Sequence, residues 1–190
     1  VLVILFLIGI AGLTLIRFYT NNKYPMDKKQ KYIFYILSVI IIAVFSYRYS
    51  LNIMTMLFVS VVSILLNIAF IDYKYGTIPN KLVLPIFIIA IVSFILNISM
   101  YKSLLFGLLF AIIFCLIIYK FSNFGGGDIK LLISLSLLIG LDNTFLLLLI
   151  SFLLGGIYGI IQIIRKKANF RSAISFGPFI TVAFTILCFI

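Results

Sequence analysis

Two aspartates stand where long apolar runs meet short polar segments of this 190-residue chain. Asp72 lies in FIDYKYGTIPN and Asp128 in FGGGDIKLL, and the chain has only four acidic residues, no Glu and no His. Acid–base chemistry therefore depends almost entirely on this pair. Two carboxylates brought together at a partly dehydrated site cannot easily both ionise, so one would hold a proton while the other acts as a base.

Such a pair can activate a water molecule for attack on a peptide carbonyl, while the protonated partner donates to the developing oxyanion. A Ser–His mechanism and a His-ligated zinc site are excluded because the chain lacks His. Cys115 and Cys188 stand singly in apolar runs, without a CxxC pair, which excludes a thiolate zinc site. We expect no metal, no cofactor and no disulfide.

Each carboxylate also has a simpler structural explanation. Asp128 precedes the apolar run LLISLSLLIG and would be the N-cap of a helix, although capping does not account for the three glycines before it. Asp72 would be an interfacial carboxylate paired with Lys74. The glycines allow positive φ and close backbone approach, so an extended peptide could lie against Gly125–Gly127.

Composition indicates the kind of scaffold that must position these residues. The chain is 65% hydrophobic and 10% charged, whereas a soluble domain is about half apolar and about a quarter charged. Apolar runs continue from Val1 to Ile190, and we read the first as a mature span because it has no basic n-region. We predict an all-α membrane bundle in a single domain, with eight spans at about residues 1–18, 32–49, 52–71, 81–99, 103–120, 128–141, 143–164 and 174–190.

The basic residues predict how this bundle is oriented. Of the 15 Lys and Arg residues, 13 fall in the loops after the first, third, fifth and seventh spans. The positive-inside rule places those loops in the cytoplasm, with both termini outside and both aspartates on the cytoplasmic side. The net charge of +11 is thereby explained by topology and by contact with the lipid bilayer, not by nucleic acid.

The remaining polar and small residues in the spans are interpreted as structural. Gly155 and Gly159 form a GxxxG pattern that predicts close helix packing. Asn52, Asn67 and Asn97 are expected to bond across helices. The other two acids, Asp27 and Asp142, are expected to be solvated.

Three segments resemble the type IV prepilin peptidases, a family of bacterial intramembrane-type aspartic proteases. The GxGD motif of that family is matched by Gly125-Gly126-Gly127-Asp128, and its Asp with Ile-Pro-Asn six residues later by Asp72 and Ile78-Pro79-Asn80. Its FGP segment is matched by SFGPFI at Ser175–Ile180. The three matches fall in the order of the family.

The resemblance implies that Asp72 and Asp128 are the catalytic dyad of an aspartic endopeptidase in the bacterial cytoplasmic membrane. Its implied partner is a prepilin or pseudopilin precursor, cut after a Gly between a basic leader and an apolar helix. It also implies that the other motif residues shape the site or bind substrate: Gly125, Gly126, Gly127, Lys130, Ile78, Pro79, Asn80, Gly177 and Pro178.

One departure from the family bears on a second activity. Bifunctional members carry a cysteine-rich cytoplasmic insert after the first span, associated with N-methylation of the mature pilin. Here that loop is only about residues 19–31 and has no cysteine. We expect cleavage without methylation.

Two other classes of function remain open on the sequence. In a small ion- or proton-coupled carrier, the two aspartates would bind ions, although carriers usually place their acids near mid-bilayer. In a non-catalytic subunit of a secretion or pilus machine, the same residues would serve packing.

Overall fold

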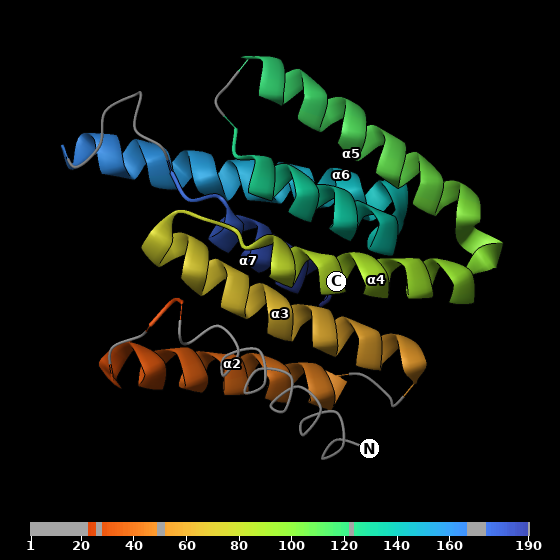
Figure 1. The fold of residues 1–190 in the computed structure, drawn as a ribbon, viewed down its shortest axis with the longest axis horizontal. Helices are drawn as coiled ribbons and strands as arrows, with labels where there is room; N and C mark the ends of the chain where they lie inside the picture. The colour runs from red at the N-terminus through yellow and green to blue at the C-terminus, as the bar shows by residue number, and fades with distance from the viewer. Residues whose placement is uncertain (1–22, 26–27, 49–51, 122–123, 167–173, 190) are drawn as a thin grey trace.

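The computed structural model describes residues 23–25, 28–48, 52–121, 124–166 and 174–189, and all regular structure in these ranges is helical. The helices lie side by side as a bundle (Figure 1). Their ranges overlap the second to eighth predicted spans, whereas the first lies outside the described residues. The elements are α2 (Lys28–Arg48), α3 (Ile53–Tyr75), α4 (Asn80–Leu96), the short 3₁₀ helix η1 (Ile98–Met100), α5 (Tyr101–Phe121), α6 (Gly126–Ile164) and α7 (Gly177–Leu187).

Helix α6 is a hairpin of two arms. At Gly140 the backbone leaves the helical region, with φ 78° and ψ −179°. Phe124, just before α6, stacks on Phe152 with ring centroids 5.9 Å apart, although a straight helix would separate them by roughly 40 Å. The second arm therefore runs back along the first, as Figure 1 shows. The predicted break between residues 141 and 143 lies next to this turn.

Helix α3 is the central element and carries Asp72. It contacts α2, α4 and α7, and side chains such as Leu65, Ile68 and Ile71 are fully buried. Its start is fixed by a capping box between Asn52 and Thr55. It ends at Gly76, which adopts the left-handed conformation with φ 63°. The helix thus continues one turn beyond the predicted limit at residue 71.

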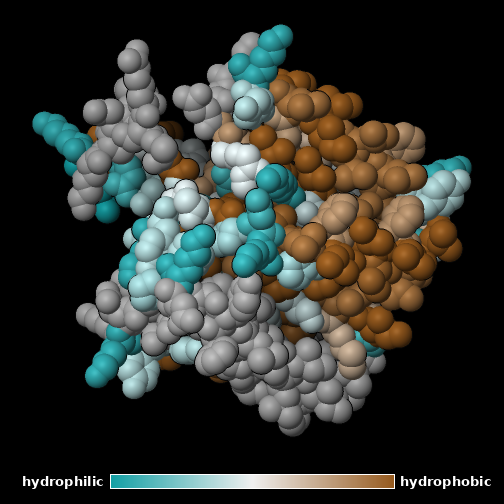
Figure 2. Space-filling model, viewed as in Figure 1, coloured by the Kyte–Doolittle hydropathy of each residue, from teal (hydrophilic) through white to brown (hydrophobic). Residues whose placement is uncertain are grey.

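The outer surface of the bundle is apolar. Helix α3, the segment Ile98–Lys120 and α6 are long and apolar enough to cross a membrane, and α4 and α7 are shorter apolar helices. On α5, Leu109, Ile113 and Leu116 are each more than half exposed. Figure 2 shows hydrophobic side chains gathered over α4 and α5. In a bilayer this surface would face lipid instead of water.

The helix ends next to the aspartates lie together at one end of the bundle, on the left in Figure 1: the start of α2, the end of α3, the start of α4, the end of α5, both ends of α6 and the start of α7. Hydrophilic side chains gather there in Figure 2. We call it the basic end, because it carries the exposed side chains of Lys28, Lys74, Lys81, Lys120, Lys130, Arg165 and Lys166. This arrangement agrees with the alternation predicted from the basic loops. The helix α2 begins at Lys28, within the segment predicted as a loop.

Candidate active site

Asp72 is held inside the bundle by a distant backbone amide. Its side chain is 4% exposed, and Oδ2 accepts a hydrogen bond of 2.8 Å from the N–H of Gly177 at the start of α7. Lys74, proposed as its partner on the sequence, directs its Nζ to the carbonyl of Pro25 at 3.0 Å. An interfacial carboxylate paired with a lysine needs neither burial nor a backbone donor. The simpler explanation therefore does not account for the surroundings of Asp72.

Asp128 lies in the first turn of α6. The helix begins at Gly126 with Gly125 as its N-cap, so the prediction that Asp128 itself caps the helix is wrong by three residues. The Asp128 carboxylate lies against the backbone of Gly125, where a Cβ would be 2.7 Å from Oδ2. Its Oδ1 is buried and accepts no hydrogen bond from the described residues. Phe124, which precedes Gly125, contacts Phe176, which precedes the Gly177 that bonds Asp72, so the two aspartates lie in the same part of the bundle.

The three segments singled out in the sequence meet at this place. Ile78 packs on Gly127, where a Cβ would lie 2.9 Å from the Ile78 Cβ. Lys130 Nζ donates to Asn80 Oδ1 at 3.2 Å. The third segment reaches the other two through the Gly177 bond to Asp72 and through the rings of Phe124 and Phe176, whose centroids are 5.2 Å apart. Pro178 follows in the first turn of α7.

The glycines before Asp128 are required for space, not for positive φ. Among the described glycines only Gly76 and Gly140 have positive φ, so residues 125–127 do not use the positive φ that glycine allows. A Cβ would collide at Gly125 and Gly127 but would meet nothing within 4 Å at Gly126. The second position of the G-x-G-D pattern therefore has room for a Cβ, whereas the first and third do not.

The model of the type IV leader peptidase family matches residues 59–160, a range that contains both Asp72 and Asp128. The chain belongs to the type IV leader peptidase family. No curated protein and no solved structure matches the chain. The FGP segment lies beyond the matched range, yet it supplies the hydrogen bond to Asp72. The family assignment and the site geometry thus rest on overlapping but different parts of the chain.

Sequence reasoning missed the aromatic residues that join these segments. Phe124, Phe152 and Phe176 contact one another, with centroids 4.8–5.9 Å apart. Phe124 and Phe176 directly precede the motif glycines 125 and 177, and that adjacency was the available signal. Nothing in the order of the sequence indicates that Phe152 contacts both of them.

The predictions for the glycine and asparagine residues of the spans are confirmed only in part. Gly155 and Gly159 pack against Phe176 and Ile174, which confirms the packing prediction. Asn97 donates across helices to Met54 Sδ at 3.2 Å, as expected. Asn67 instead donates within its own helix, to the Ser63 carbonyl, so the cross-helix prediction is wrong there. Asn52 caps α3.

A cavity of about 420 Å³ lies at the end of the bundle opposite the aspartates. It is lined by the start of α3, the end of α4 and the turn of α6, including Asn52, Asn97 and Ile139. No acidic side chain lines it. Asp142 is exposed close to that turn, as expected, and neither Cys115 nor Cys188 forms a disulfide. Asp27 lies outside the described residues.

Proposed function

We propose that this leader peptidase is an aspartic endopeptidase in which Asp72 and Asp128 form the catalytic dyad. The observation that carries the proposal is the meeting of three segments, from residues 72–80, 125–130 and 176–178, around two carboxylates of a chain that has only four. One carboxylate takes a proton from a water molecule that attacks the scissile carbonyl, and the other donates to the developing oxyanion. When the intermediate collapses, the first group gives its proton to the leaving amine and the second takes a proton back from the hydroxyl that becomes the new carbonyl.

We propose as substrate a prepilin or pseudopilin precursor with a basic leader, a Gly at the cleavage point and an apolar helix after it. In a shared bilayer the substrate helix would lie parallel to the enzyme helices, with its scissile bond at the depth of the basic end. We propose that the basic end lies in the bacterial cytoplasm, with eight spans and both termini outside. Gly125 and Gly127 already have close neighbours, which leaves Gly126 as the open backbone position beside Asp128. We propose that methylation is absent.

Cleavage by the purified protein in proteoliposomes tests the proposal. The probe is a pilin precursor with a basic leader, and the variants are Asp72→Asn and Asp128→Asn, with the exposed Asp142→Asn as matched control. We expect each dyad variant to lose cleavage by about 10³-fold or more, since neither amide can exchange the proton. The control should cleave at the wild-type rate.

Two outcomes would contradict this function. Cleavage at the wild-type rate by either dyad variant would remove that carboxylate from the mechanism. An inactive wild type that carries a flux of protons or ions, abolished in Asp72→Asn, would support a carrier instead. Circular dichroism of each variant shows whether a loss of cleavage reflects a loss of folding.

A further inference from the structure

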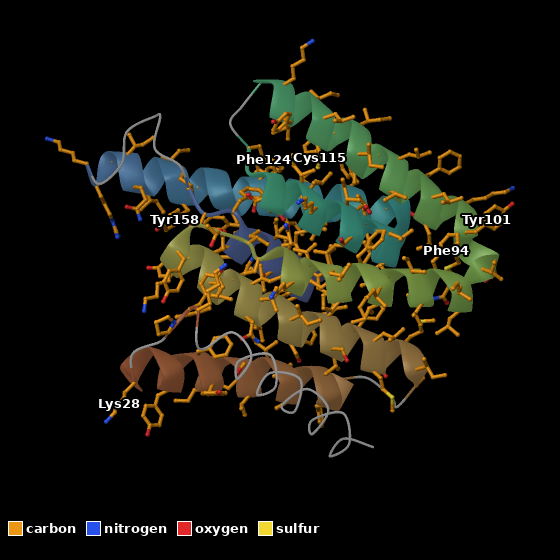
Figure 3. The ribbon with its side chains drawn as sticks, in the orientation of Figure 1. Lys28, Phe94, Tyr101, Cys115, Phe124 and Tyr158 are labelled. Carbon is orange, nitrogen blue, oxygen red and sulfur yellow. The ribbon has the colours of Figure 1, made fainter. Side chains whose placement is uncertain are left out.

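Three phenylalanine rings from separate parts of the chain form a cluster beside the aspartates. Phe176 is 9% exposed and contacts both Phe152, at 4.8 Å between centroids, and Phe124, at 5.2 Å. Phe124 and Phe152 stack at 5.9 Å. Figure 3 shows Phe124 beside the start of α6. Each ring contacts the other two, and closely packed side chains pass a displacement on to their neighbours.

Two of these rings are attached to the backbone that holds the carboxylates. Phe176 directly precedes Gly177, whose N–H bonds Asp72. Phe124 directly precedes Gly125, against which the Asp128 carboxylate lies. The ring cluster therefore connects the hydrogen-bond donor of one aspartate to the backbone support of the other.

The second arm of α6, which supplies Phe152, also packs against the cluster at Gly155. A Cβ on the buried Gly155 would lie 2.9 Å from Cε2 and 3.3 Å from Cδ2 of the Phe176 ring. At the next residue, Gly156, a Cβ would meet no atom within 4 Å. Two adjacent glycines in one helical turn thus differ in whether a methyl group would move Phe176.

We propose that Gly155 and Phe176 are positioning residues that set the separation of the Asp72 and Asp128 carboxylates without contacting substrate. The inference rests on the proposed dyad. A methyl group at residue 155 pushes the Phe176 ring, which is in contact with the rings of Phe124 and Phe152. The displacement passes to the Gly177 N–H and the Phe124 backbone, and so to both carboxylates.

Steady-state cleavage of a pilin precursor in proteoliposomes separates Gly155→Ala from Gly156→Ala. We expect kcat of Gly155→Ala to fall by about 10- to 100-fold, since a misplacement of about 1 Å can cost about 100-fold. KM should stay within about twofold because substrate contacts are unchanged. Gly156→Ala should retain the wild-type kcat and KM, and the thermal unfolding midpoint of both proteins shows that they are folded.

Phe176→Leu provides a second test, because leucine lacks the Cε2 atom that the added methyl group would meet. We expect Phe176→Leu to lower kcat with little change in KM, and the further addition of Gly155→Ala to lower kcat no more. Effects that multiply would overturn the proposal, as would a wild-type kcat in Gly155→Ala or a raised KM at unchanged kcat. If Gly155→Ala does not fold, the kcat of folded Phe176→Leu decides, and a wild-type value overturns the proposal. Absence of cleavage by the wild type is instead a failure of the proposed function.

Discussion

Gly177 donates its backbone N–H to Oδ2 of Asp72 at 2.8 Å, across 105 residues of sequence. The same glycine leaves room for the carboxylate, because a Cβ at residue 177 would lie 2.9 Å from Oδ2 and 3.1 Å from the Asp72 Cβ. One residue thus orients the side chain by a hydrogen bond and gives it the space in which to lie. A hydrogen bond from a backbone donor to a carboxylate is charge-assisted and among the stronger ones in proteins.

Gly177→Ala is expected to displace the Asp72 carboxylate. The added methyl group meets Cβ, Cγ and Oδ2 of Asp72 within 3.2 Å, and Asp72 is on a buried helix that cannot retreat. Cleavage of a pilin precursor should fall by about 100-fold, as for other misplaced catalytic groups. The free energy of unfolding should fall by about 1–3 kcal/mol, as for other overpacked sites. Wild-type cleavage by a folded Gly177→Ala protein would contradict the role of this contact.

Gly125→Ala and Gly126→Ala should differ although they are neighbours. At residue 125 the methyl group would lie only 2.7 Å from the Asp128 Oδ2. The carboxylate must therefore turn away, and cleavage should be nearly lost. At residue 126 it meets nothing within 4 Å, and alanine in a helix is favoured over glycine by about 0.5–1 kcal/mol. Parallel cleavage and thermal unfolding assays check both. Equal losses of cleavage in the two variants would contradict this account.

The sequence predicted which segments meet at the candidate site better than it predicted their geometry. Asp72, Asp128 and the FGP segment could be found because carboxylates are scarce in an apolar chain and because their neighbours form recognisable motifs. The N-cap assignment of Asp128 failed because three glycines make the helix start ambiguous, and the helix begins as soon as Gly126. The contacts of Phe152 could not be predicted, because they depend on how two arms of one hairpin pack and not on local order.

The hairpin itself depends on Gly140. Its φ of 78° with an extended ψ is a conformation that only glycine adopts readily, and a Cβ would lie 2.7 Å from Ser103 Oγ. That hydroxyl accepts the N–H of Leu141 at 3.2 Å, so its displacement breaks a further contact between α5 and α6. Gly140→Ala should lower the free energy of unfolding by about 2 kcal/mol. Thermal unfolding in detergent checks this, and equal midpoints for Gly140→Ala and the unhindered Gly156→Ala would contradict it.

The orientation of the bundle predicts opposite accessibility at the two ends of α4. Thr77 and Ser99 are both exposed, the first at the basic end and the second in η1. Between them α4 has 17 residues, which rise roughly 26 Å, close to the thickness of the hydrocarbon core. In a protein carrying Cys115→Ala and Cys188→Ala, Thr77→Cys should react with a membrane-impermeant maleimide only from the cytoplasmic side. Ser99→Cys should react only from the outside, together with Asn143→Cys next to the turn of α6. Labelling of residues 77 and 99 from the same side would mean that α4 does not cross the membrane. Labelling with the two sides reversed would place Asp72 and Asp128 away from the cytoplasm.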